Sequence, residues 1–258
     1  MSATQKPRIP SLLKKYLMAL SGLVLVLFVL GHMIGNLQFF AGPEVINAYA
    51  YHLHHLPGNP VSLWLIRLVL LATLLIHVWM AVLLTKENRE ARPDTYLDQK
   101  TSVATYASRT MPISGVLILA FIVFHILQFT VRVVPEHYDK TIGESSIEVG
   151  HVPLEYFDVF AMMVAGFSSP LISLFYIVTM GLLCMHLTHG VSSMFQSVGL
   201  RNESWRPKLK AAALAYGWII FLGFASIPAA VLAGFGKDYL ADKEAQWRAA
   251  AAVTTQSH

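Results

Sequence analysis

Five long apolar segments constrain this chain more than any other feature of its sequence. They cover residues 12–40, 61–85, 111–131, 170–197 and 211–235, and none of them contains Asp or Glu. A run of about 18 apolar residues or more is long enough to cross a bilayer as a helix. Charged residues make up only 13% of the chain, about half the usual share in a soluble domain. The sequence therefore predicts an all-α integral membrane protein, a single domain over residues 1–258 with five transmembrane helices.

The basic residues are distributed by connection, which predicts the orientation of the helices. The N-terminus and the second and fourth connections carry thirteen Lys and Arg, counting those at the segment ends, and the other side carries five. Basic connections stay in the cytoplasm, so we expect a cytoplasmic N-terminus and an external C-terminus. The apolar segments imply the lipid bilayer as a partner. The net charge of +4 is not gathered in one patch, so we expect no nucleic acid partner.

The connections themselves carry weaker signals. Residues 41–60 have a partly helical, amphipathic pattern, and the acidic connection 132–168 predicts a short interfacial helix near 153–166. Pro60 and Pro170 are expected to begin helices, because proline favours the first helical turn. We expect a frayed tail over 241–258 and identify no internal repeat.

Four of the five apolar segments carry histidine, which is costly in a membrane and points to function. At about 1.5 Å per residue, His32 and His125 lie ~9–12 Å below the outer surface. By the same rise, His77 and His186 lie ~24–26 Å below it. The four histidines thus form an outer pair and an inner pair, each drawn from two helices. For any one of them, a packing role is the ordinary alternative.

Two histidines at equal depth can ligate one flat cofactor, and haem iron in a helical bundle accepts such axial imidazoles. Small residues near the histidines would admit a porphyrin, although they serve helix packing equally well; they are Gly22, Gly31, Gly35, Ala81, Gly181 and Gly190. Zinc is disfavoured, since Cys184, His186 and His189 lack the fourth ligand of a structural site. The HLHH run at 52–55 is expected to be interfacial and solvated.

Several motifs together resemble the di-haem, five-helix cytochrome b subunit of succinate:quinone oxidoreductases, the succinate dehydrogenase and fumarate reductase family. They are GHMIGNLQFF, NAYAYHLHHLP, LIHVWMAV, FIVFHILQF and MHLTHGVSSMFQSVG, in this order along residues 10–235. Each motif alone is weak, and the ordered set is specific.

The resemblance implies two b-type haems, with the distal haem iron held by His32 and His125 and the proximal one by His77 and His186. A flavoprotein subunit and an iron–sulfur subunit would dock on the cytoplasmic face, and electrons would pass through the haems to a quinone, with menaquinone expected. No catalytic residue for the dicarboxylate is expected in this chain. The implied location is the bacterial inner (plasma) membrane, with several crossings.

Further residues receive roles on the same basis. Arg67 is expected to pair with a distal haem propionate and His189 to lie beside the proximal haem without ligating it. Arg109 and Arg132 would bind propionates or extend to the interface. Some fumarate-reducing members carry a helix carboxylate two residues before the ligand on the fourth helix, where this chain has Cys184. We therefore expect electrogenic electron transfer and favour succinate oxidation. The quinone is expected near the distal haem and residues 47–60.

Two other classes stay open. A cytochrome b of the hydrogenase or formate dehydrogenase type would share the histidine chemistry but not the order of the motifs. A transporter with a histidine proton relay is less favoured. Transporter sites use broken helices near the membrane midplane, for which we see no sign in this sequence, and the apolar segments contain no carboxylate.

Overall fold

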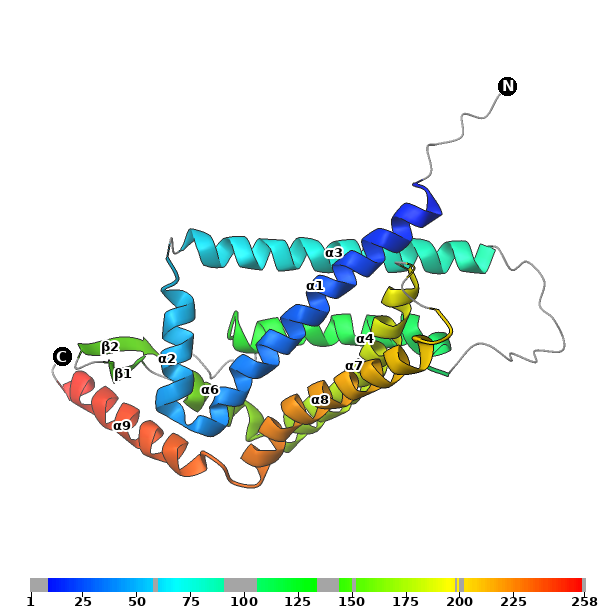
Figure 1. The fold of residues 1–258 in the computed structure, drawn as a ribbon. Coiled ribbons are helices and arrows are strands. Elements are labelled where there is room, and N and C mark those ends of the chain that lie inside the picture. The colour runs from blue at the N-terminus through cyan, green and yellow to red at the C-terminus, as the bar shows by residue number, and fades with distance from the viewer. Residues whose placement is uncertain are drawn as a thin grey trace.

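The computed structural model describes residues 9–57, 60–90, 106–133, 144–149, 152–197, 199 and 202–256. Long helices dominate this part of the chain (Figure 1). In chain order the elements are α1 (Ser11–Leu37), the 3-10 helix η1 (Gln38–Ala41), α2 (Pro43–His54), α3 (Val61–Glu90), α4 (Tyr106–Phe129), β1 (Glu144–Val149), β2 (Val152–Phe157), α6 (Val159–Phe167), α7 (Pro170–Ser197), α8 (Arg206–Leu232) and α9 (Lys237–Gln256).

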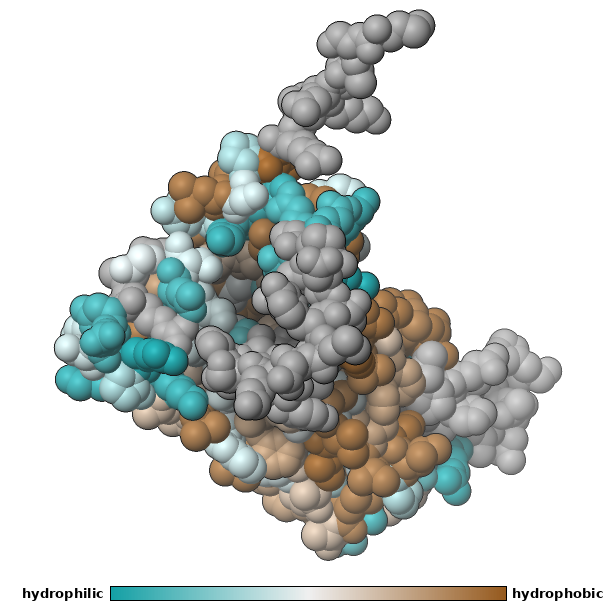
Figure 2. Space-filling model, turned by 90° about the vertical axis from the view of Figure 1, so that its right-hand side faces the viewer, coloured by the Kyte–Doolittle hydropathy of each residue, from teal (hydrophilic) through white to brown (hydrophobic). Residues whose placement is uncertain are grey.

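Five helices are long and apolar enough to cross a membrane, which confirms the predicted number of membrane helices. These spans are Ser11–Ala41, Val61–Glu90, Met111–Phe129, Pro170–Ser197 and Arg206–Leu232. Their outward surfaces are rich in exposed apolar side chains such as Leu171, Val116 and Trp79. Figure 2 shows this brown apolar surface over much of one face, with hydrophilic residues gathered toward its upper and left edges. Such a surface suits lipid rather than water.

The membrane helices pack in a defined order. α7 and α8 form the most extensive contact and lie side by side in Figure 1, while α1 packs on α3, α7 and α8, and α4 packs on α7. Two glycines that the sequence analysis passed over allow close approach. A Cβ atom on Gly217 would lie 2.9 Å from the Cys184 carbonyl oxygen, and one on Gly223 would overlap the Met33 side chain. Small residues serve this purpose at helix contacts in membranes.

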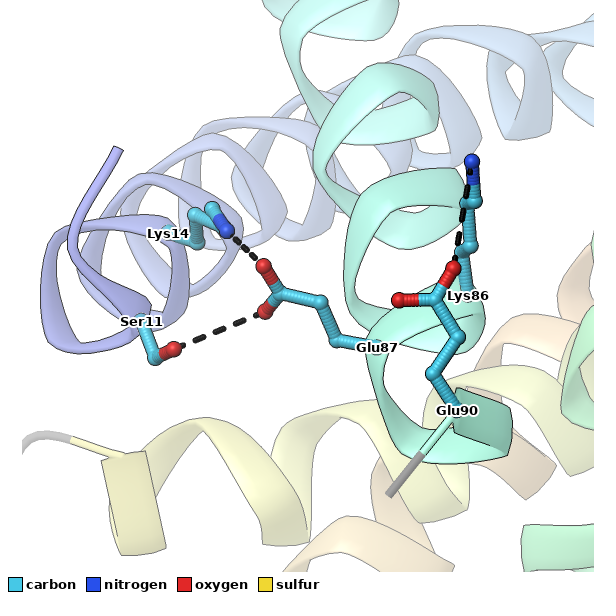
Figure 3. Close-up of polar contacts among 5 residues, drawn as sticks. All are labelled: Ser11, Lys14, Lys86, Glu87 and Glu90. Atoms are coloured by element: carbon cyan, nitrogen blue, oxygen red, sulfur yellow. Dashed lines mark hydrogen bonds and ion pairs between the residues drawn. The ribbon is translucent and has the colours of Figure 1, made fainter. Parts of the chain in front are cut away.

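A polar contact joins the start of α1 to the end of α3 (Figure 3). Lys14 is buried and forms an ion pair with Glu87, and Ser11 lies at 3.5 Å from the second oxygen of the same carboxylate. The neighbouring pair Lys86–Glu90 is exposed, at 3.9 Å. A buried ammonium requires a charged partner, so Glu87 fixes the relative register of the two antiparallel helices.

The connections form a cap at one end of the bundle, made of α2, the β1–β2 hairpin, α6 and α9 (Figure 1). Asp158 is fully buried within it. One carboxylate oxygen accepts from Asn47 Nδ2 at 3.0 Å and from the Ala161 amide at 2.9 Å, and the other accepts from the Tyr239 hydroxyl at 2.6 Å. This carboxylate therefore ties α2 and α9 to the first turn of α6.

The cap corrects two predictions. The helix expected over 153–166 begins only at Val159, because residues up to Phe157 pair with β1 as a strand and Asp158 caps the helix. The tail expected to fray is helical up to Gln256, since Ala, Lys, Glu and Gln are strong helix formers. The hairpin itself was not predicted. The helical pattern of 41–60 and the helix starts after Pro60 and at Pro170 are confirmed.

We expect Gly217→Ala to weaken the contact between α7 and α8, because the added methyl meets the backbone of Cys184 at 2.9 Å. Overpacking of this kind costs about 1–3 kcal/mol, measurable as a lower free energy of unfolding in mixed detergent micelles. Gly181→Ala is the matched control on the same interface, since its Cβ would lie 3.9 Å from a ring of α8. Equal effects of the two substitutions would contradict this reading.

Asp158→Ala is expected to loosen the cap. It removes the acceptor of three buried donors, and each such loss costs about 1–3 kcal/mol. Proteolysis within α9 should become faster while the helix content measured by circular dichroism is retained. The control is Asp238→Ala, an exposed aspartate in the first turn of α9. Unchanged proteolysis of the Asp158 variant would show that the carboxylate does not hold the cap.

Candidate cofactor-binding site

The four predicted histidines meet in two pairs within the bundle. His32 on α1 and His125 on α4 have ring centres 5.8 Å apart, at an interplanar angle of 84°. His77 on α3 and His186 on α7 have ring centres 6.4 Å apart, at 61°. The pairing is the one that the helix depths predicted. We keep the names outer pair for the first and inner pair for the second.

The pairs connect helices that pack mainly on other neighbours. In the described part of the chain α3 packs chiefly on α1, and α4 chiefly on α7. The inner pair nevertheless brings α3 to α7, and the outer pair brings α1 to α4. The histidine rings thus add contacts between α3 and α7 and between α1 and α4, two helix pairs that otherwise touch little, while α1 also packs directly on α7 and α8.

The spacing of the rings suits one metal ion between them. An imidazole nitrogen binds a metal at about 2 Å, and the ring centre lies about 1 Å further on, so two opposed ligands have centres about 6 Å apart. Both observed distances, 5.8 and 6.4 Å, agree with this span. Among the residues that the structure describes, no group of three or more His, Cys, Asp or Glu gathers for an ordinary metal site.

Each inner histidine lies against a Ser–Gly step. His77 Nδ1 is 3.4 Å from Ser21 Oγ, and its Cε1 would be 3.4 Å from a Cβ added to Gly22. His186 Nδ1 is likewise 3.4 Å from Ser114 Oγ, beside Gly115 on α4. Sequence reasoning missed both serines and Gly115.

These steps belong to an internal repeat, and the prediction of no repeat is wrong. Residues 18–32 and 111–125 both follow the pattern M-x2-S-G-x5-F-x3-H. The phenylalanine of each copy stacks on the histidine one turn later, with ring centres 5.3 Å apart in the first copy and 5.9 Å in the second. The repeat was overlooked because most of its positions are interchangeable apolar residues. Its five shared residues become visible only when the contacts of the serines and histidines are known.

The outer pair lies beneath the cap in an aromatic environment. His125 Nδ1 is 3.2 Å from the hydroxyl of Tyr176, which donates to Gln128 Oε1 at 2.7 Å. Gln128 is fully buried, and its Nε2 has no hydrogen-bond partner. Phe129 packs against His125 and against Phe167 of α6, with ring centres 5.5 and 5.4 Å apart. Sequence reasoning missed Tyr176 and Gln128, whose neighbours lie on different helices.

The structure also places three of the other predicted site residues, Arg67, Arg132 and His189. Arg67 lies half-buried with its guanidinium 5.2 Å from the centre of the Trp64 ring, and Arg132 lies 4.1 Å from that of Phe157. His189 Nε2 is 3.2 Å from Ser193 Oγ, one turn beyond His186. The side chain of Arg109 lies outside the described residues. None of these contacts tests the predicted roles of the three arginines or of His189.

The small residues near the histidines were expected either to admit a porphyrin or to serve helix packing, and their contacts differ from one to the next. Gly22 adjoins His77, whereas a Cβ on Gly35 would collide with the Tyr49 hydroxyl and one on Gly181 would meet an α8 ring. Cβ atoms on Gly31 and Gly190 would meet nothing within 4 Å. The histidines of the HLHH run are exposed, as expected; they are His52, His54 and His55.

No family model matches the chain, and no curated protein or solved structure matches it.

Proposed function

We propose that this chain is the di-haem cytochrome b membrane subunit of a succinate:quinone oxidoreductase. It would pass electrons between an iron–sulfur subunit and menaquinone. The iron–sulfur subunit would be bound on the cytoplasmic face together with a flavoprotein subunit. The observation that carries the proposal is that four histidines lie in two pairs, each drawn from two helices. In each pair the distance between ring centres suits one metal ion bound by both rings.

The surroundings of both pairs fit a bound haem. Gly22 and Gly115 keep side chains away from the Cε1 edges of His77 and His186. At the outer pair, the unpartnered Nε2 of buried Gln128 supplies a hydrogen-bond donor one turn from His125. A buried donor without a partner is costly, so a propionate or another acceptor on a bound group would relieve it.

When bound, haem supplies one-electron chemistry whose potential depends on the axial ligands and their surroundings. The protein's part is to hold the four imidazoles and to exclude water from them. It also spaces the two pairs along α1, α3, α4 and α7 so that electrons can cross the bilayer stepwise. Arg67 stays the candidate for a distal propionate, since a charge inside a membrane span needs a partner.

The identity of the complex rests on the ordered motifs that resemble this family, which imply a bacterial inner membrane. The charge bias of the connections favours a cytoplasmic N-terminus. A cytochrome b subunit of a hydrogenase or formate dehydrogenase would fit the paired histidines as well. A histidine-relay transporter would not need two rings about 6 Å apart at each of two places. Neighbouring reading frames for a flavoprotein and an iron–sulfur protein would separate the first two readings.

The purified full chain is expected to contain two b-type haems, counted by the pyridine haemochrome spectrum. His32→Ala, His77→Ala, His125→Ala and His186→Ala should each lower the count, because each removes one axial ligand. His189→Ala and the exposed His52→Ala are the controls and should keep both haems. No haem in the unaltered chain would refute both cytochrome readings. Loss of a haem in His189→Ala with retention in His186→Ala would reverse the assignment of those two residues.

Succinate oxidation by the complete complex in proteoliposomes is expected to depend on the membrane potential. The apolar segments contain no Asp or Glu to carry a compensating proton, and one charge crossing the membrane exchanges about 2.3 kcal/mol per 100 mV. Dissipating an imposed potential with an uncoupler should therefore change the rate of menaquinone reduction by succinate. An unchanged rate would contradict electrogenic transfer.

A further inference from the structure

We propose that Ser21, Ser114 and Tyr176 are positioning residues that select one tautomer of His77, His186 and His125. Each of these histidines would then present Nε2 to the bound iron. The inference rests on the proposed haem function and assigns residues that the family resemblance did not supply.

The argument at the inner pair starts from the single hydrogen of a serine hydroxyl. Ser21 Oγ donates to the carbonyl of Leu17 at 2.7 Å and is also 3.2 Å from that of Met18. With its hydrogen engaged on its own helix, Ser21 can only accept from His77 Nδ1, 3.4 Å away. The backbone of Met18 is a second hydrogen-bond partner of the His77 ring. A neutral imidazole carries one N–H, so with Ser21 as its acceptor the proton lies on Nδ1 and the lone pair on Nε2.

The second copy of the repeat reproduces this arrangement. Ser114 Oγ donates to the carbonyl of Met111 at 3.1 Å and lies 3.4 Å from His186 Nδ1. The same reasoning leaves Nε2 of His186 with a free lone pair. Two serines at equivalent positions thus prepare both rings of the inner pair in one way.

A tyrosine takes the serine's place at the outer pair. The Tyr176 hydroxyl donates to Gln128 Oε1 at 2.7 Å, and its oxygen lies 3.2 Å from His125 Nδ1. Its hydrogen is committed to Gln128, so it accepts from His125. His125 thus donates to the Tyr176 hydroxyl, which donates to the amide oxygen of Gln128, and Nε2 of His125 is again left for the iron.

His32 differs from the other three. Asn36 Nδ2 lies 3.4 Å from both of its ring nitrogens and donates to the His32 carbonyl at 2.7 Å. An amide NH2 donates and does not accept, so Asn36 cannot receive the ring proton. In the outer pair, His125 therefore has a hydrogen-bond acceptor, the Tyr176 hydroxyl, at Nδ1, whereas His32 faces a donor, the Asn36 amide.

The acceptors have an electronic consequence. A hydrogen bond from the second ring nitrogen makes a ligating imidazole more basic, which favours ferric over ferrous iron and lowers the potential. Loss of such a partner changes metal affinity by about tenfold or more. A tenfold change in the ferric-to-ferrous preference equals about 59 mV for one electron.

Redox titration of the full chain in membranes, followed optically, tests the inference. Ser21→Ala and Ser114→Ala should each raise the potential of the same haem by about 59 mV, the tenfold change above. Tyr176→Phe should raise that of the other haem by a similar amount. The low-spin electron paramagnetic resonance signal of the affected haem should shift as well, because the ring loses its orienting bond. Ser226→Ala and Tyr216→Phe are the matched controls, since both hydroxyls donate to backbone carbonyls and contact no histidine.

The outcomes separate this inference from the proposed function. An unaltered chain without two haems would overturn the proposed function itself. Two haems whose potentials stay unchanged in all three variants would overturn the positioning roles alone. If Ser21→Ala loses a haem, Ser21→Thr, which keeps the hydroxyl, should retain it with a nearly normal potential. Loss in both would show that the hydroxyl is not the cause and would also overturn the inference.

Discussion

The structure depends on the cost of placing a polar ring in an apolar bundle. Inside a membrane, each hydrogen-bonding group must find its partner within the protein. Four imidazoles in this chain lie in two pairs, and each contacts a hydroxyl or amide group on its own or a neighbouring helix. The rings bring α1 to α4 and α3 to α7, helix pairs with little other contact, whereas α1, α7 and α8 pack on one another directly.

The repeat gives this arrangement a simple physical form. In each copy a serine holds the histidine of the following long helix, and a phenylalanine stacks on the copy's own histidine. Both rings of the inner pair consequently have a serine hydroxyl beside Nδ1. The outer pair differs, since Tyr176 accepts behind His125 while Asn36 donates toward His32. Two chemically different sites thus arise from one repeated helix pattern.

The cap and the ion pair at the opposite end close the bundle by different means. At one end the buried Asp158 carboxylate accepts three hydrogen bonds from α2, α6 and α9. At the other, Glu87 neutralises buried Lys14. Apart from the N-cap bond to Ala161, the partners in these contacts lie tens of residues apart and have no local sequence signal. The ion pair joins two of the histidine-bearing helices, α1 and α3.

The sequence by itself determined the five membrane helices and the pairing of the four histidines. Both follow from local quantities, namely apolar length and the number of residues between a histidine and its helix end. Only the tertiary structure decided that Tyr176 lies behind His125, that Gly217 admits the backbone of α7, and that the stretch before Asp158 is a strand. Such contacts depend on the rotation of each helix about its axis and on which neighbour it meets. An almost uniformly apolar helix carries little pattern from which that rotation can be read.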